Sequence, residues 1–222
     1  MNIWQRLRGL FTAPPEGWSA LAAVLVMMLV AAAAVDESAW AGPIAGTKTS
    51  QTGFLPLDAL LATMIGYRNG RVDVKAWTGG PVAAGNIAWA RQSLPLIIDH
   101  GRLNPALNDS SQWGFTLGNA IRVWRTGAGI DRNGNLIYAA ANYQTVTSLA
   151  KILQRAGAVR AMQLDINPEW PTLIAYAHHS GLDPTKIVPN DQQPETRYLV
   201  PDDRDFFAVY RRLPGPIDVP FR

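Results

Sequence analysis

Short segments of alternating apolar and polar residues, separated by turn residues, predict strands joined by hairpins. The residues after Asn69-Gly70 alternate in this way (RVDVKA), so we expect a hairpin with strands near 62–68 and 71–77. An Asn-Gly pair at this position predicts a type I′ turn, in which both residues have positive φ. The apolar residues 57–64 before it are compatible with a short helix as well as with the start of a strand.

The same pattern predicts further strands toward the C-terminus. A second hairpin is expected at the turn 131–134, between the segments 120–125 and 135–140. Residues 88–93 and 94–99 flank a proline and are typical of extended chain, whereas the Asn, Asp, Ser and Pro residues of 102–114 indicate a loop.

Residues 145–156 carry the strongest helical pattern. Thr145 or Thr147 can cap the start, and Gly157 stands where a helix commonly ends in a left-handed residue. We expect a strand at 159–164, a short helical or extended piece at 170–176, loop-like chain from 181 and a closing strand at 206–211. Hairpins with one main helix predict an α+β fold with a mixed, largely antiparallel sheet.

The N-terminal part has a different pattern, because residues 19–35 contain no charge. Arg6 and Arg8 precede this run, and acidic residues follow it. With Trp18, the run just reaches the length of a membrane span, and the charge asymmetry places residues 1–17 in the cytoplasm. We therefore expect a transmembrane helix at 18–35, a linker at 36–56 and an extracytoplasmic domain at 57–222. The alternatives are a signal peptide cleaved after Ala41, which would release a secreted protein, and a buried soluble helix.

Composition narrows the function classes. The 222 residues are 48% hydrophobic and 17% charged, which excludes an intrinsically disordered chain. The chain has no cysteine, so disulfides, thiol nucleophiles and cysteine-bound metals are excluded. A formal net charge of +3 is too small to predict a nucleic-acid partner.

The densest group of candidate site residues follows the strand at 159–164. Asp165, Asn167 and Glu169 offer three oxygen-bearing side chains within five residues. They could perform acid–base chemistry or bind a divalent cation, or they could cap a turn instead. Trp170 beside them and Trp113 in the loop 102–114 are candidates for stacking on a sugar.

Arg125-Thr126 precedes two glycines and is a second candidate, since a guanidinium and nearby backbone N–H groups suit a phosphate. A tight hairpin with an exposed arginine is the alternative. Asp99 precedes His100, but adjacent residues of a strand point to opposite faces, so their coupling is a weaker prediction.

The order of motifs resembles the C-terminal half of the phosphodiester glycosidase family. The matching positions are Arg125-Thr126, Gly129, Asp131, Gly134, Leu149-Ala150, Gly157-Ala158, Ala161 and Leu164-Asp165. The segments ARQSLPLIIDHGRLNPAL and RYLVPDDRDFFAVYRR are similar to its bacterial branch, so the resemblance extends over roughly residues 62–212.

The resemblance implies an exported hydrolase acting on a sugar-1-phosphodiester of envelope glycans. Arg125 would hold the phosphate, and Asp165 or Glu169 would act as acid/base or cation ligand, with Asp99 a weaker member of the set. Two departures stand out. Ile166–Trp170 replaces the family's Gly-Gly-x-Ser, removing glycine-dependent geometry and a hydroxyl, and most of the family's first half is missing. The alternative function is therefore a non-catalytic module that binds an envelope glycan or a protein.

Overall fold

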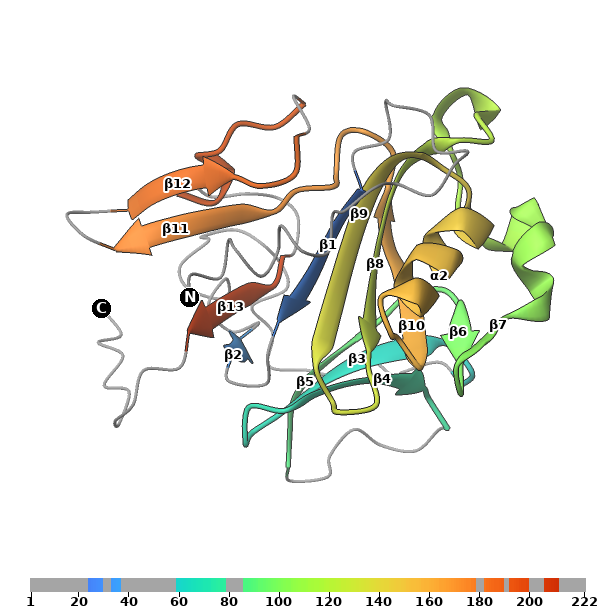
Figure 1. The fold of residues 1–222 in the computed structure, drawn as a ribbon, viewed down its shortest axis with the longest axis horizontal. Coiled ribbons are helices and arrows are strands. Elements are labelled where there is room, and N and C mark those ends of the chain that lie inside the picture. The colour runs from blue at the N-terminus through green and yellow to red at the C-terminus, as the bar shows by residue number, and fades with distance from the viewer. Residues whose placement is uncertain are drawn as a thin grey trace.

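The computed structural model describes residues 24–29, 33–36, 59–78, 86–178, 182–189, 192–199 and 206–211. Its centre is a six-stranded sheet in the order β1-β9-β8-β10-β6-β7 (Figure 1). The strands are β1 (Val24–Leu29), β9 (Leu136–Gln144), β8 (Val123–Ile130), β10 (Arg160–Ile166), β6 (Ile98–Asp99) and β7 (Arg102–Leu103). The expected α+β class is confirmed, but the described strands pair only antiparallel.

Helix α2 (Val146–Arg155) covers one face of this sheet and confirms the helix expected at 145–156. Thr145 caps it, and its side chain and that of Ser148 form a reciprocal capping box. The helix lies close to β8 because β8 presents glycine there: a Cβ on Gly127 would lie 2.9 Å from Leu153 Cδ1. The apolar face of α2 and the sheet thus form the main core.

A three-stranded antiparallel sheet in the order β4-β3-β5 packs against the opposite face. It consists of β3 (Ala62–Tyr67), β4 (Val72–Ala76) and β5 (Ile87–Gln92). Met162 and Ala128 of the central sheet pack with Val74 in a second core cluster. Arg160 ties the sheets together, since its Nε donates to the Val74 carbonyl at 2.7 Å and it pairs with Asp73.

Both predicted hairpins form, but the turn at Asn69-Gly70 is not type I′. Gly70 has a φ of 81°, Asn69 is not among the residues with positive φ, and Gly70 N donates to the Tyr67 carbonyl at 2.8 Å. This geometry is a type I turn followed by a left-handed glycine in a three-residue loop. The β8–β9 turn has the same arrangement, with Gly134 at a φ of 81°.

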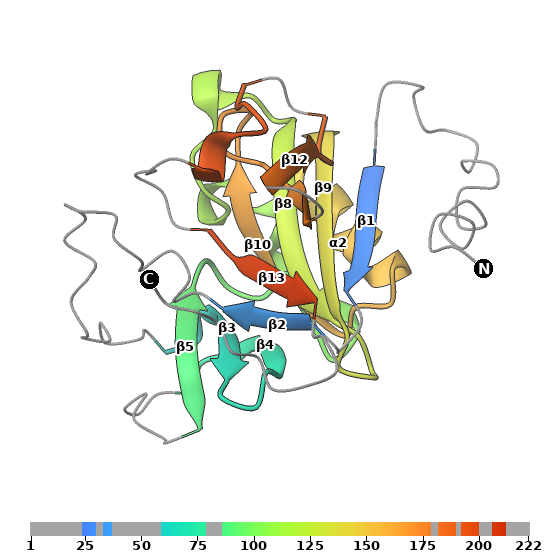
Figure 2. The ribbon, with the colours of Figure 1, turned by 90° about the vertical axis from the view of Figure 1, so that its left-hand side faces the viewer.

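Two further two-stranded sheets lie toward the C-terminus. One pairs β11 (Ile174–His178) with β12 (Leu182–Lys186), as Figure 1 shows, and the other pairs β13 (Ala208–Arg211) with β2 (Ala33–Asp36), as Figure 2 shows. We expected 182–186 to be a loop because the region is rich in proline, but Pro184 lies opposite Tyr176 in this isolated hairpin. An edge position tolerates a residue without an N–H. Short 3₁₀ helices occupy Pro105–Asn108, Ser110–Gln112, Leu117–Asn119 and Arg197–Leu199.

The N-terminal apolar run differs from the expected transmembrane helix. Within 18–35, Val24–Leu29 is a strand that pairs with β9 from Leu136 to Ala141, and the end of the run begins the strand β2 (Ala33–Asp36). Pairing with the edge of β9 satisfies backbone N–H and C=O groups of Val24–Leu29, as a helix would. In the described part of the chain, no helix is long and apolar enough to cross a membrane. The remainder of 1–56, with the expected linker and cleavage site, lies outside the described residues.

Candidate functional site

Arg125 lies between two β-bulges at one end of the central sheet. In β10, Gln163 pairs with Gly127 and Ile166 with Arg125, so Leu164 and Asp165 together oppose a single residue of β8. In β9, Asn142 and Tyr143 likewise oppose a single residue between Val123 and Arg125. Bulges change the direction of neighbouring groups and are frequent beside functional sites. The sheet is therefore irregular on both sides of Arg125.

The guanidinium of Arg125 is buried and its hydrogen bonds go to neutral acceptors. Nε donates to the Gln144 carbonyl at 3.1 Å, and Nη1 donates to Gln163 Oε1 at 2.6 Å and more weakly to the Trp113 carbonyl at 3.5 Å. Burial lowers the pKa of Arg125, which is only 5% exposed. Within the described chain no carboxylate pairs with this cation. A buried charge without a counter-ion is costly, so the arrangement suits an anionic ligand.

Gln163 is a site residue that the sequence did not reveal. Its side chain is 2% exposed, and its Nε2 donates to the Trp113 carbonyl at 3.0 Å while its Oε1 accepts from Arg125. A glutamine inside a buried strand is unusual, and this was the available signal. Its neutral amide holds the arginine without neutralising it.

Asn167 joins the end of β10 to the loop 113–119. Its Oδ1 accepts from Leu117 N at 3.1 Å, its Nδ2 donates to the Phe115 carbonyl at 3.3 Å, and its own N–H donates to the Trp124 carbonyl. Its φ is 73°, a left-handed conformation that favours glycine and that asparagine tolerates. The left-handed geometry that we expected to be lost with the family's glycines is present at this position.

Asp165 and Thr126 lie on the other face of the sheet. Arg125 shares a face with Gly127, which α2 covers, whereas Tyr138 packs with Trp124 on the opposite face. Thr126 Oγ1 donates to the Asp165 carbonyl at 2.8 Å. Burial raises the pKa of Tyr138, and the Tyr198 hydroxyl and the Asp165 carboxylate raise it further. The Asp165 carboxylate thus lies near Tyr138, and the bulge directs it away from Arg125.

Glu169 and Trp170 occupy the turn after β10. Glu169 Oε2 is buried without a hydrogen-bond partner among the described residues, and the Glu169 carbonyl accepts from Gln193 Nε2 at 3.1 Å. Trp170 is partly buried. The expected cation site does not form as a set of three free oxygens, because Asn167 is engaged by the loop. No group of three or more His, Asp or Glu side chains in the described part of the chain could hold a metal ion.

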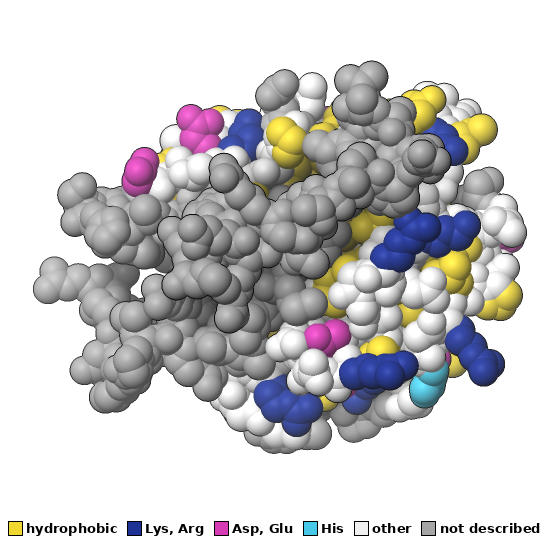
Figure 3. All heavy atoms as spheres, viewed as in Figure 1, with side chains coloured by type: hydrophobic (Ala, Val, Ile, Leu, Met, Phe, Trp, Pro, Cys, Tyr) yellow, Lys and Arg dark blue, Asp and Glu magenta, His cyan; other side chains and the backbone are white. Residues whose placement is uncertain are grey.

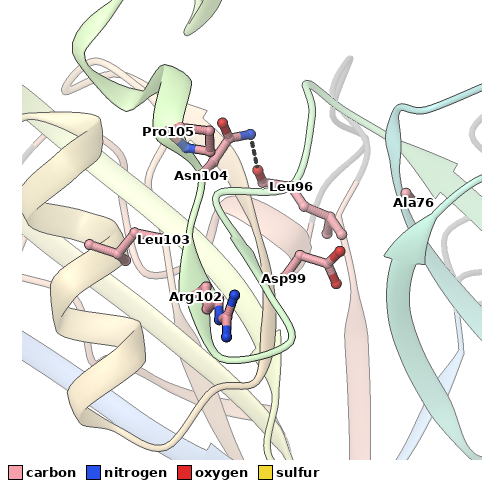
Figure 4. Close-up of a pocket in the computed structure, with 7 residues that line it drawn as sticks. All are labelled: Ala76, Leu96, Asp99, Arg102, Leu103, Asn104 and Pro105. Atoms are coloured by element: carbon pink, nitrogen blue, oxygen red, sulfur yellow. Dashed lines mark hydrogen bonds between the residues drawn. The ribbon is translucent and has the colours of Figure 1, made fainter.

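Asp99 is separate from all of these residues. Its neighbour Ile98 pairs with Ala161, five positions along β10 from Ile166, which corresponds to about 16 Å. His100 Nδ1 lies 2.9 Å from Asp99 Oδ1, and His100 has a φ of 48°. Both side chains are exposed, and Asp99 lines a hollow of about 380 Å³ together with Arg102 and Asn104 (Figure 4). Asp99 therefore does not share a site with Arg125.

Trp113 contributes its backbone to the site and not its ring. The ring is 1% exposed in the main core, and Nε1 donates to the Ala106 carbonyl at 3.0 Å. Stacking of a sugar on Trp113 is thus excluded in this conformation. The segment before Trp113, which we expected to be a loop, contains the two 3₁₀ helices Pro105–Asn108 and Ser110–Gln112.

Comparisons with known proteins place the chain in a family. No curated protein sequence matches it significantly. One similar solved structure is the zebrafish N-acetylglucosamine-1-phosphodiester alpha-N-acetylglucosaminidase catalytic domain, auto-inhibited by its pro-peptide. It is 20% identical at a TM-score of 0.39, and the match covers 50% of this chain and 41% of the zebrafish chain. A hypothetical protein from Synechocystis is 19% identical at a TM-score of 0.32, covering 52% of this chain and 30% of its own.

This chain therefore spans less than half the length of either solved structure. A sequence model of the phosphodiester glycosidases matches residues 46–165, which is more than half of the chain and includes Arg125 and Asp165. The protein belongs to the phosphodiester glycosidase family.

Proposed function

We propose that this chain is a phosphodiester glycosidase-like hydrolase that acts on a sugar-1-phosphodiester of envelope glycans. The observation that carries the proposal is the buried guanidinium of Arg125, which is held by neutral acceptors and lacks a carboxylate partner in the described chain. Charge-assisted hydrogen bonds to a phosphate would compensate this charge. Arg125 Nη2 donates no hydrogen bond to the described residues. It is also not one of the fully buried side-chain atoms that lack a partner, so we assign it to the ligand.

In the proposed reaction, Arg125 binds the phosphate and a carboxyl group protonates the leaving oxygen or activates water. Glu169 and Asp165 are the candidates: Asp165 lies in the bulge of β10, and Glu169 follows the end of this strand. Asp99 is left out because it lies at the other end of the sheet.

One observation favours a second function. Arg125 and Asp165 occupy opposite faces of the sheet, and a single phosphodiester would not contact both in this arrangement. A module that binds the phosphodiester through Arg125 without cleaving it needs only the arginine face. We therefore propose glycan binding without turnover as the alternative.

A panel of sugar-1-phosphomethyl diesters separates the two functions. The full chain is incubated with each diester, and sugar release and binding are measured by NMR. We expect release from at least one member and its loss in Arg125→Gln, with Arg132→Gln as the matched control at an exposed arginine in the β8–β9 turn. Binding without release supports the module, and absence of both contradicts the assignment of Arg125.

We also propose that the domain lies outside the cytoplasm and that residues 18–35 provide either a membrane anchor or a cleaved signal. The charge asymmetry about this run supports export. Pairing of Val24–Leu29 with β9 and insertion of the same residues into a bilayer are mutually exclusive. A C-terminal reporter that is active only outside the cytoplasm tests export, and fractionation with the mass of the mature chain distinguishes anchor from cleavage. An inactive reporter contradicts the proposal.

A further inference from the structure

Exposed apolar side chains gather around the Arg125 end of the central sheet. Seven large hydrophobic side chains of the described chain are exposed, and four of these lie at this end. The four, which we call the apolar rim, are Phe115 (77% exposed), Leu117 (53%), Ile121 (80%) and Tyr143 (64%). In Figure 3, hydrophobic side chains adjoin Lys or Arg side chains at the upper right of the molecule.

Backbone contacts place the rim beside the guanidinium. The Trp113 carbonyl accepts from Arg125 Nη1, and Phe115 follows two residues later, at most about 7 Å of chain away. On the other side, Tyr143 belongs to the β9 bulge that opposes the residue before Arg125. Ile121 precedes β8 by two residues. The rim thus borders the site on two sides.

The rim is held in place by the fold. Asn167 binds both Phe115 and Leu117 through their backbones, and the next residues complete a short 3₁₀ helix, Leu117–Asn119. Tyr143 has a φ of 58° and its ring lies under the Arg122 guanidinium, 5.5 Å from the ring centroid to Cζ. Apolar side chains that a fold fixes in solvent, next to a polar site, are typical of binding surfaces.

We propose that the apolar rim binds the lipid chain of an amphiphilic phosphodiester whose phosphate lies against Arg125. This inference rests on the proposed function for the phosphate position, and it adds the class of the aglycone. Complementarity favours a lipid phosphodiester as the ligand. Its anionic phosphate matches the buried cation of Arg125, and its apolar chain matches the exposed apolar side chains of the rim. Arg122, which is exposed beside Tyr143, adds a second positive charge at the boundary.

The size of the effect follows from apolar burial. Each methylene group that leaves water contributes about four-fold to affinity. A chain of ten carbons that places even two or three methylenes on the rim should therefore bind at least about ten-fold more tightly than a methyl group.

Dimethyl phosphate and decyl methyl phosphate are the two probes, titrated into the full chain below the micelle concentration of the longer one. We expect the decyl ester to bind at least about ten-fold more tightly. In the variant F115S/L117S/I121S, this advantage should fall to about three-fold or less, while dimethyl phosphate binding stays unchanged. The control is L60S, which removes a side chain that is equally exposed (76%) in another part of the chain.

Equal affinities of the two esters for the wild-type chain would overturn the inference, as would an unchanged chain-length advantage in the triple variant. Loss of a self-association that sedimentation detects, with the chain-length advantage retained, would assign the rim to a contact between copies and also overturn it. Circular dichroism establishes that the triple variant is folded. If no diester is hydrolysed but the advantage behaves as expected, the hydrolase proposal fails and the lipid inference stands.

Discussion

The two faces of the central sheet differ most where β8 and β10 meet. On the face that α2 covers, Arg125 is a buried cation surrounded by amide and carbonyl oxygens. On the opposite face, the Asp165 carboxylate lies near Tyr138, and the Asp165 carbonyl accepts from the Thr126 hydroxyl. One extra residue in β10 separates them, since without the bulge Asp165 itself would lie opposite Arg125 and share its face. A bulge can thus keep two opposite charges apart although their strands are neighbours.

The largest effect is expected from removing the cation itself. Arg125→Met keeps the apolar stem but deletes the charge and its donors, and charge-assisted hydrogen bonds contribute about 1.5–3 kcal/mol each. Binding of dimethyl phosphate should weaken by about 100-fold or more, measured by NMR titration. Binding that persists at wild-type strength would place the anion on the other face.

A smaller effect is expected where the two faces meet, at Asn167. Asn167→Ala loses two side-chain hydrogen bonds. It also places an alanine, which has a Cβ but no polar side chain, in the left-handed conformation at a φ of 73°. We expect about 2 kcal/mol of lost stability in urea denaturation. Asn167→Gly keeps the backbone conformation and should lose less. If both variants are equally unstable, the amide and not the left-handed backbone accounts for the effect.

Gln163→Glu adds a carboxylate to the arginine face and so removes the difference between the faces. The new charge pairs with Arg125 in the place of Gln163 Oε1, and the anion then meets a neutralised cation. We expect dimethyl phosphate binding to weaken by about ten-fold, or about 1.4 kcal/mol, while the melting temperature stays equal or rises. Gln154→Glu, an exposed change on α2, controls for net charge. A variant that binds normally would show that the guanidinium does not contact the ligand.

The smallest effect is expected on the other face. Tyr138→Phe removes the weak hydrogen bond from the hydroxyl to the Thr172 carbonyl at 3.4 Å, so we expect a stability loss of at most about 1 kcal/mol. Dimethyl phosphate binding should not change, because the hydroxyl lies across the sheet from Arg125. A loss of binding comparable to that of Gln163→Glu would show that the two faces act as one site.

Local elements could be predicted from the sequence because their causes are local. The helix 145–156 has its cap, its apolar spacing and its terminal glycine within thirteen residues, and all three are present in the structure. The Asn69-Gly70 hairpin was predicted from two turn residues and the alternation after them. Its turn type was not, since it depends on whether the flanking strands close a two- or three-residue loop.

The candidate site could be predicted only in part. Arg125 was identified, but its partners Gln163 and the Gln144 and Trp113 carbonyls belong to other strands and loops, so no short pattern contains them. The grouping of Asp165 with Arg125 also depended on register. A bulge is a property of two strands together, and the sequence of β10 alone does not show which residue is extra.

The neutral surroundings of Arg125 have a consequence for its response to acidity. Carbonyl and amide oxygens do not titrate, and an arginine stays protonated even though burial lowers its pKa. A phosphodiester keeps its single negative charge over the same range. Anion binding at Arg125 should therefore be nearly constant from about pH 4 to about pH 9, so the protein would hold its ligand equally well in acidified and in neutral surroundings.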